Sequence, residues 1–295
     1  GLPLALRESM QQVALNIRGS LREFLDEIVR YPDDADITVR ESGNDGVSTT
    51  EIPHGGVVTR VMSMDAVASL FEPGGTVENG LPGYEFREQQ VRMVERVSEA
   101  FRDKSNLLFD AGTGVGKSLG YLMPAAIFSR HFEELVVIST NTIALQEQLI
   151  AKDLPTTALL CSVDDAFGNV GLRFSEMKGR TNYLCRRRFR DFAGSDGLTI
   201  RDVRFVLKLM VWLNSTKTGD REEVRLTNAD QRLWERVCGR SGDDCYNREG
   251  DCFFRQARVK ASDSDVLVVN HALLLANSQA GGSLLPEYQL SLIHI

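Results

Sequence analysis

The sequence of 295 residues contains no apolar run of the length that crosses a membrane, and it carries no excess of positive charge. Because a spanning helix needs about 20 apolar residues in succession, we predict a protein with no membrane partner. The 41 acidic residues outnumber the 34 basic ones, giving a formal net charge of −7, so any binding to nucleic acid must use a local basic patch. With 42% hydrophobic and 25% charged residues, the composition excludes a wholly disordered or fibrous protein.

The sequence also has no even set of cysteines for disulfides, and its first residues do not show the pattern of a secretory leader. The five cysteines are an odd number, and the first ten residues lack the charged-then-apolar order of a signal peptide. Both features favour a reducing, cytoplasmic setting. The last six residues, 290–295, resemble a translated sequencing adapter, and we interpret them as an artefact. The alternative is a genuine buried strand, because the run is apolar.

The order of apolar patterns predicts an α/β domain with an insertion. Residues 1–68 begin with an amphipathic helix at 4–30 and are interpreted as a connector or the end of an upstream domain. A segment rich in glycine and proline at 72–83 marks a boundary. Helices are then expected at 86–103, 117–130 and 142–152, and strands at 106–109, 135–140 and 265–270. This alternation is typical of a parallel sheet with helices on both faces, formed by 69–160 and 263–289. Residues 161–262 break the alternation and are interpreted as an insertion between two strands.

A glycine-bearing loop followed by lysine and serine is the most specific motif of the chain. Glycines let backbone N–H groups turn inward to make an anion-binding nest, and the following helix adds its positive end. In such a loop Lys117 reaches the β- and γ-phosphates of a nucleotide, and the Ser118 hydroxyl binds Mg²⁺. Ala111 stands where the general pattern has glycine. The predicted nucleotide-binding residues are Ala111, Gly112, Thr113, Gly114, Val115, Gly116, Lys117 and Ser118.

All five cysteines lie in the predicted insertion, and four of them, Cys185, Cys238, Cys245 and Cys252, are candidate ligands. Four thiolates can bind a tetrahedral metal ion or an iron–sulfur cluster. Zinc sites usually contain a pair of ligands two to four residues apart, and no such pair exists here, so the spacing fits a bulkier cluster better. Four free thiols are the alternative. Cys161 lies in an apolar context and is expected to be an ordinary buried cysteine.

A basic patch surrounds the first of these cysteines. Residues 178–190 carry six basic side chains and no acid, with Tyr183 and Phe189 interleaved. Phosphate contacts combined with aromatic stacking are typical of single-stranded nucleic acid binding, although such a run can also be a solvated face. Thr140, Asn141 and the Asn270-His271 pair end predicted parallel strands, where ligand contacts of such sheets gather.

Several ordered blocks together resemble the DinG-type helicases, bacterial relatives of the XPD family. The resemblance covers about residues 69–289. It rests on Gly83–Gln90, Asp110–Ser118, Ser139–Gln148, Lys178–Cys185, the three later cysteines, and Val268–Leu274. The resemblance implies a RecA-like ATPase domain, interrupted by an iron–sulfur insertion, of an ATP-dependent DNA helicase that moves 5′ to 3′ on single-stranded DNA.

The resemblance also implies roles for individual residues. Arg87 and Gln90 would contact the adenine side of ATP, and Thr140 and Asn141 the backbone of the DNA strand. The four cysteines would ligate a [4Fe–4S] cluster. The residues beside the cluster near the DNA path would be Arg180, Asn182 and Tyr183, with Arg186, Arg187 and Arg188 in the same basic patch.

Hydrolysis of ATP needs an acidic residue on a neighbouring strand to hold the metal and position water. No Asp-Glu pair follows the predicted strand at 265–270. In many of these helicases a strand ending in Asp-Glu-Ala-His follows shortly after residues such as Leu285–Tyr288. We therefore expect this chain to bind nucleotide without turning over ATP. Some relatives carry an N-terminal exonuclease domain, for which residues 1–68 show no carboxylate motif. The alternative function is a non-helicase nucleotide-binding protein with a structural zinc site.

Overall fold

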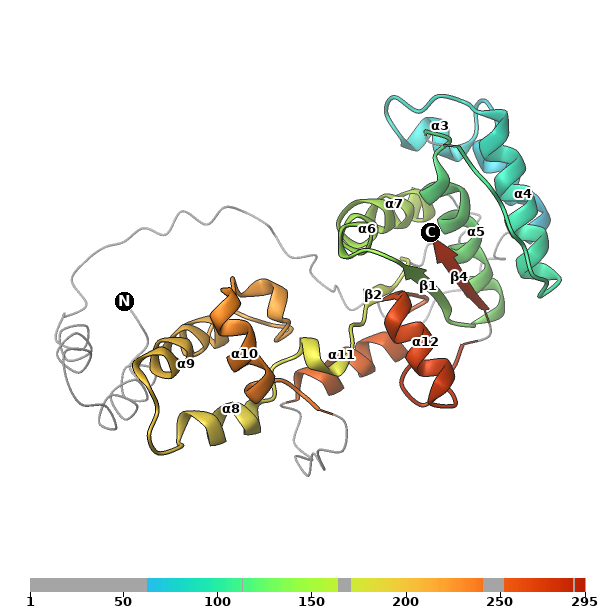
Figure 1. The fold of residues 1–295 in the computed structure, drawn as a ribbon. Helices are drawn as coiled ribbons and strands as arrows, with labels where there is room; N and C mark the ends of the chain where they lie inside the picture. Colours follow the sequence, from blue (N-terminus) through green and yellow to red (C-terminus); the bar gives the residue numbers. More distant parts are fainter. Residues whose placement is uncertain (1–62, 113, 164–170, 241–251, 289, 295) are drawn as a thin grey trace, which may run out of the picture. The chain divides into compact units, whose positions relative to one another are not determined.

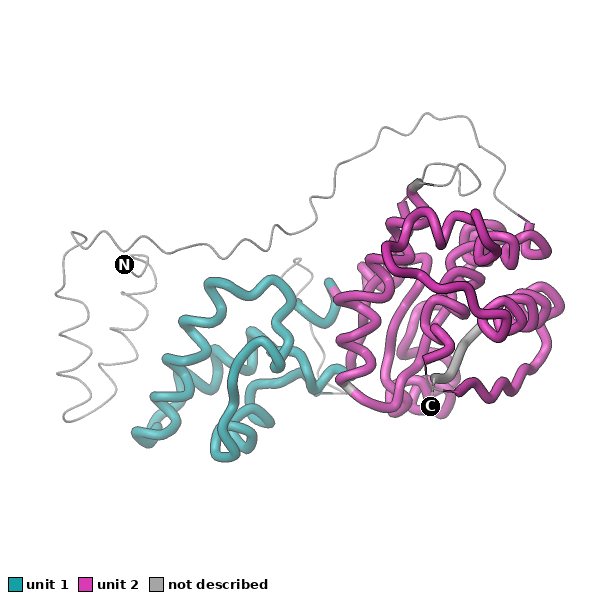
Figure 2. The backbone as a smooth tube through the Cα atoms, turned by 90° about the horizontal axis from the view of Figure 1, so that it is seen from above, with its two compact units in different colours: residues 1–56, 179–256 teal, residues 57–178, 257–295 magenta. Residues whose placement is uncertain are grey.

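A computed structural model describes residues 63–112, 114–163, 171–240, 252–288 and 290–294. The chain divides into two compact units (Figure 2). The described part of the first unit lies within residues 179–256, and that of the second within residues 63–178 and 257–294. The amphipathic helix expected at 4–30 lies outside the described residues.

The second unit is built on a parallel sheet in the strand order β2-β3-β1-β4. Figure 1 labels β1, β2 and β4 of this sheet. In the centre, β1 (Val136–Thr140) pairs with β3 (Val266–Asn270), so that Thr140 and Asn270 end side by side. The outer strands are β2 (Phe174–Glu176) and β4 (Leu290–His294). All five residues of β1 are buried, which means that both faces of the sheet are covered. The predicted α/β class is confirmed, and the arrangement is consistent with part of a RecA-like domain.

The helices of this unit follow the expected order. Their bounds are η1 (Met64–Phe71), α3 (Thr76–Gly80), α4 (Glu88–Arg102), α5 (Lys117–Phe132), α6 (Ile143–Gln148), the π turn η2 (Leu149–Asp153), α7 (Leu154–Val163) and α12 (His271–Gln279). The helix α11 (Phe253–Ser262) spans the boundary between the units. Apolar residues of α4 recur at helical spacing and pack on α5, where Gly120 leaves room for the Met93 side chain. Phe101 and Phe128 meet in this core with ring centroids 5.4 Å apart.

The strand expected at 106–109 is absent, and that prediction is wrong. Residues 105–112 form no regular structure, and the Leu108 side chain is 97% exposed. A strand exists only where a neighbour completes its hydrogen-bond ladder, and none of the four described strands pairs with this segment. The glycine loop therefore follows an extended segment rather than a strand of the sheet.

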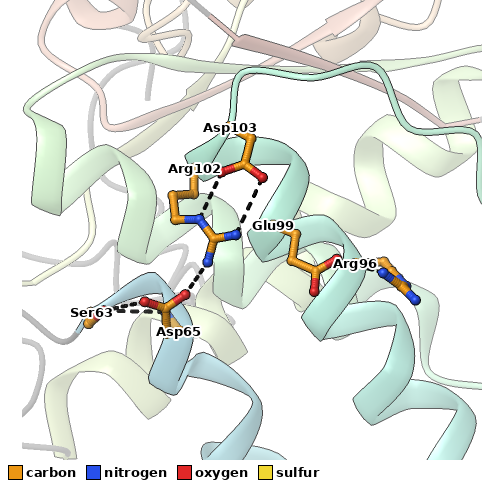
Figure 3. Close-up of polar contacts among 6 residues, drawn as sticks. All are labelled: Ser63, Asp65, Arg96, Glu99, Arg102 and Asp103. Carbon is orange, nitrogen blue, oxygen red and sulfur yellow. Dashed lines mark hydrogen bonds and ion pairs between the residues drawn. The ribbon is translucent and has the colours of Figure 1, made fainter.

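An exposed polar network joins η1 to the end of α4 (Figure 3). The Arg102 guanidinium donates to both carboxylate oxygens of Asp103, at 2.9 and 3.3 Å, and to Asp65. These partners raise the pKa of Arg102, with Asp103 contributing most, and the pKa of Asp103 is lowered in return. Because the groups are exposed, such pairs orient side chains more than they stabilise the fold.

Asp265 holds the starts of β2 and β3 together, and its removal should destabilise this unit. The side chain is 5% exposed and accepts from the Arg173 backbone N–H and from Arg173 Nη2, both at 2.8 Å, with Arg130 Nε at 3.6 Å. We expect Asp265→Ala to cost about 3 kcal/mol, because arginine groups and an N–H lose a buried partner. Hydrogen exchange at the β2 and β3 amides measures this. The exposed neighbour Asp263→Ala is the control, and equal exchange in both variants would contradict the prediction.

The first unit is helical in its described part. It contains η4 (Arg180–Asn182), α8 (Arg186–Ala193), α9 (Ile200–Leu213), η5 (Arg221–Glu223) and α10 (Asn228–Val237). Capping boxes start α9 at Thr199 and α10 at Thr227, because each threonine hydroxyl and the aspartate three residues later satisfy each other's backbone N–H. Lys208 Nζ joins α9 to α10 through Asp230 at 2.8 Å. Both tryptophans of the chain, Trp212 and Trp234, lie in this unit with ring centroids 6.2 Å apart.

The predicted domain boundaries and the interpretation of 290–295 stay predictions. The structure forms β4 from 290–294, and an apolar segment can pair in this way whatever its origin. No helix among the described residues is both long and apolar enough to span a membrane.

Candidate functional site

The glycine loop ends at the first turn of α5. Gly114 and Gly116 adopt left-handed conformations, with φ of 80° and 81°, which glycine reaches without strain. Gly116 is the N-cap residue, so α5 begins at Lys117 and its free N–H groups lie at the loop. The Lys117 ammonium donates to the Ala111 carbonyl across the loop at 3.2 Å. Lys117 and Ser118 are half-buried, and Thr113 lies outside the described residues.

A pocket of about 500 Å³ opens beside this first turn. Its lining comes from three stretches: the segment 81–90, the residues Gly116–Leu119, and the junction of η2 with α7. Burial raises the pKa of the neighbouring Tyr121 hydroxyl, a hydrogen bond with Ser118 opposes this shift, and the Asp153 charge adds to it. Lys117 and Ser118 thus share one cavity with Arg87 and Gln90.

Gln90 supports the glycine loop from behind. Its side chain is 2% exposed, its Nε2 donates to the Gly116 carbonyl at 3.0 Å, and its Oε1 accepts from the Tyr84 hydroxyl at 3.1 Å. A Cβ atom at Gly116 would come within 2.4 Å of this amide. Arg87 is more open and pairs with Glu85 at 3.0 Å. Of the two residues expected on the adenine side, Arg87 is therefore the one with an accessible polar group.

The carboxyl ends of β1 and β3 bring polar residues to one edge of the sheet. Thr140 is buried and its hydroxyl donates to the Thr142 carbonyl at 3.2 Å, whereas Asn141 is exposed. Asn270 caps α12 by accepting from the Leu273 N–H at 2.7 Å. His271 Nδ1 lies 2.7 Å from Ser139 Oγ, which ties the two strand ends together. Asn141 is thus the better placed of the two residues expected to contact a DNA backbone.

Three of the four cysteines predicted as ligands lie on segments that contact one another. The Cys185 N–H donates to the Val237 carbonyl at 2.9 Å, and Leu184 forms an antiparallel bridge with Cys238. Arg186 stacks over Phe253, the residue after Cys252, at 4.4 Å. These three thiols are free, and Cys245 lies outside the described residues. Within the described ranges, no group of three potential ligands is close enough to hold a metal ion.

The donor set itself suits an iron–sulfur cluster, because thiolates are the ligands such clusters take. Cys238 is buried, and burial raises the pKa of its thiol, while the charges of Arg188 and Arg240 act to lower it. The separate Cys161 is buried in the core of the other unit, as predicted.

The basic patch combines exposed and packed side chains. Arg187 and Arg190 are exposed, whereas Arg180 stacks over Phe254 at 4.7 Å, and Arg188 Nε donates to the Arg236 carbonyl at 3.2 Å. Asn182 Nδ2 donates to the Gly179 carbonyl at 3.0 Å. The two interleaved aromatic residues are buried, Tyr183 at 4% and Phe189 at 7% exposure. The arginines are therefore the groups of this patch that can meet a ligand.

The structure adds residues to the site that the sequence did not single out. Tyr84 holds the Gln90 amide, and Lys152, Asp153 and Thr156 line the pocket. Tyr84 lies in the block Gly83–Gln90 on which the family resemblance rests, so the sequence could have indicated it as a site residue. The residues at the η2–α7 junction carried none, because their position depends on how α7 packs beside α5.

Comparison with known proteins gives a consistent relationship. No protein-family model matches the chain. It is 38% identical over 227 residues to the ATP-dependent DNA helicase YoaA of Escherichia coli, which covers 74% of this chain and 34% of that protein. It is 34% identical over 247 residues to the ATP-dependent helicase DinG of Mycobacterium tuberculosis, covering 77% and 35%. The 3'-5' exonuclease DinG of Bacillus subtilis is 35% identical over 211 residues, covering 70% and 22%.

The chain therefore aligns with about a third or less of the length of these curated relatives. The aligned region covers most of this chain in each case. The chain is homologous to a segment of the DinG- and YoaA-type ATP-dependent DNA helicases.

Proposed function

We propose that this chain is the ATP-binding part of the first motor domain of a DNA helicase that moves 5′ to 3′ on single-stranded DNA. The single observation that carries the proposal is the pocket shared by Lys117, Ser118 and Arg87. A lysine and a serine at the start of a helix, behind a glycine loop, suit a nucleoside triphosphate and its Mg²⁺. Relatives named as ATP-dependent DNA helicases support the identity of the nucleotide and of the substrate.

The chain is proposed to bind ATP without hydrolysing it. Among the described residues, the central strands β1 and β3 are followed by Asn141 and His271, so neither offers a carboxylate to hold Mg²⁺ and position water. The outer strand β2 ends in Glu176, which pairs with Lys178 at 4.0 Å. Single-turnover hydrolysis by this chain would contradict this part of the proposal.

DNA contacts are proposed at two places. Asn141 follows β1 in the second unit, and the arginines Arg180, Arg186, Arg187 and Arg188 belong to the first unit. We propose that the thiolates of Cys185, Cys238, Cys245 and Cys252 hold the [4Fe–4S] cluster. The first of these ligands, Cys185, directly precedes three of these arginines in the sequence. When bound, such a cluster would cross-link the segments that carry its ligands.

Titration of the chain with a fluorescent ATP analogue, and separately with labelled single-stranded oligonucleotide, tests the function. We expect Mg²⁺-dependent binding of the nucleotide and salt-sensitive binding of the oligonucleotide, because phosphate contacts release counterions. Absence of nucleotide binding would overturn the proposal. Binding of nucleotide alone, at low as well as moderate salt, would reduce it to a nucleotide-binding protein.

Replacing Gln90 should weaken the binding of every ligand of the glycine loop to the same extent. In Gln90→Ala the Gly116 carbonyl loses its donor and the loop loses its support, so we expect about tenfold weaker binding of ATP, GTP and tripolyphosphate. Tyr84→Phe should show a smaller effect of the same kind, since it removes only the hydroxyl that holds the amide. A loss confined to ATP would show instead that Gln90 reads the base.

A further inference from the structure

The pocket has a polar lining at the junction of η2 and α7. Lys152, Asp153 and Thr156 share the pocket with Lys117 and Ser118. The π turn Leu149–Asp153 ends at Asp153, and α7 starts at the next residue. A π turn changes which side chains a helix presents, and such turns recur at functional sites.

The Asp153 carboxylate is held in place and retains an unused oxygen. Its Oδ2 accepts from Gln148 Nε2 at 3.0 Å, while no hydrogen bond or ion pair within the described ranges uses Oδ1. The backbone behind it is fixed, because the Thr157 hydroxyl donates to the Asp153 carbonyl and the Thr156 hydroxyl to the Lys152 carbonyl, both at 2.8 Å. A half-buried acceptor on a fixed helix turn is suited to bind a donor group of a ligand.

The position of Asp153 limits which donor this can be. The phosphates of a nucleotide belong at the free N–H groups of α5 and at Lys117, and a carboxylate repels them. Asp153 lines the same pocket as Lys117 and Ser118, so it lies close to the first turn of α5. In a nucleoside triphosphate the hydroxyls of the sugar are the neutral donors nearest to the phosphate chain.

We propose that Asp153 accepts a hydrogen bond from a ribose hydroxyl of the bound nucleotide and makes the pocket selective for that hydroxyl. The geometry that carries this is a fixed carboxylate with one open oxygen, in the same cavity as the lysine and serine of the glycine loop. The inference rests on the proposed function, since it assumes that this pocket binds ATP.

The test compares ATP, 2′-deoxy-ATP, 3′-deoxy-ATP and tripolyphosphate, each with Mg²⁺, by isothermal titration calorimetry. For the unmodified chain we expect one deoxy analogue to bind about tenfold more weakly than ATP. Asp153→Asn should weaken the binding of ATP about tenfold and abolish the difference in affinity between ATP and that analogue. The affinity for tripolyphosphate should not change. Glu147→Gln, which removes an exposed carboxylate of α6 outside the pocket lining, should behave like the unmodified chain.

Three results would overturn the proposal. If Asp153→Asn leaves ATP affinity unchanged, the carboxylate does not contact the nucleotide. If the substitution weakens the binding of tripolyphosphate as much as that of ATP, the carboxylate affects the metal or the loop and not the sugar. If the unmodified chain binds neither ATP nor tripolyphosphate, the proposed function fails, and the sugar contact fails with it.

Discussion

A chain carrying Lys117→Ala is expected to bind ATP about a hundredfold more weakly than the unmodified chain. The ammonium group lies at the mouth of the glycine loop, within 3.2 Å of the Ala111 carbonyl, where the β- and γ-phosphates would replace that carbonyl as its partner. A hydrogen bond between charged groups contributes about 1.5–3 kcal/mol, and the upper end of that range corresponds to about a hundredfold in affinity. Titration with a fluorescent ATP analogue in the presence of Mg²⁺ measures the change.

Lys104→Ala is the matched control for this variant. Lys104 pairs with Glu134 at 3.3 Å and does not line the pocket, so its loss removes the same charge without touching the site. We expect the control to retain the affinity of the unmodified chain within about twofold, since Lys104 does not line the pocket. Equal losses in both variants would mean that net charge, and not a contact in the loop, governs nucleotide binding.

The elements that the sequence predicted well are those with a strong local pattern. The strands Val136–Thr140 and Val266–Asn270 are β-branched runs, and α4 has apolar residues at helical spacing. The strand at 106–109 has a comparable apolar run and is absent, because strand formation depends on a neighbour that local sequence does not specify. The single helix expected at 142–152 is instead α6, a π turn and α7, which continues to Val163. Pro155 lacks the N–H that would bond to the carbonyl four residues earlier, and the π turn lies where that ladder shifts.

The candidate site also contains features that a local sequence pattern indicates and features that depend on packing. The residues of the glycine loop could be identified because their spacing reflects the shape of a phosphate group. The burial of Gln90 and Tyr183 could not be predicted, since it results from contacts between distant segments. Gln90 lies where α4 packs on α5, and Tyr183 packs against Phe254 and bridges to Asp220. The Gln90 amide bonds to the Tyr84 hydroxyl and to the Gly116 carbonyl, which changes its expected role from ligand contact to support of the glycine loop. Spacing alone can suggest the cysteine ligands, but not whether the segments that carry them come together.

A chain carrying Cys238→Ser, purified without oxygen, is expected to lose the iron that we propose for the unmodified chain, which would be about four atoms for each [4Fe–4S] cluster. Cys238 is buried at the end of α10, and its segment bridges to Leu184 beside Cys185, so it lies where the two cysteine-bearing segments meet. A serine hydroxyl is a poor substitute for a thiolate, and the loss of one ligand exposes the cluster to solvent and oxidation. Iron analysis and the broad visible absorption of the cluster measure the effect.

Cys161→Ser separates the loss of a ligand from the loss of any cysteine. Cys161 is buried in the core of the second unit, so this variant should retain its iron and colour even if the added hydroxyl weakens the core. The fluorescence of Trp212 and Trp234 provides a second readout, because both lie in the unit that carries the proposed ligands. If the cluster cross-links that unit, Cys238→Ser should unfold at lower denaturant concentration by this signal, whereas Cys161→Ser should not. Iron content unchanged by Cys238→Ser would exclude that residue as a ligand. A colourless unmodified chain that contains zinc would favour a structural zinc site over the cluster.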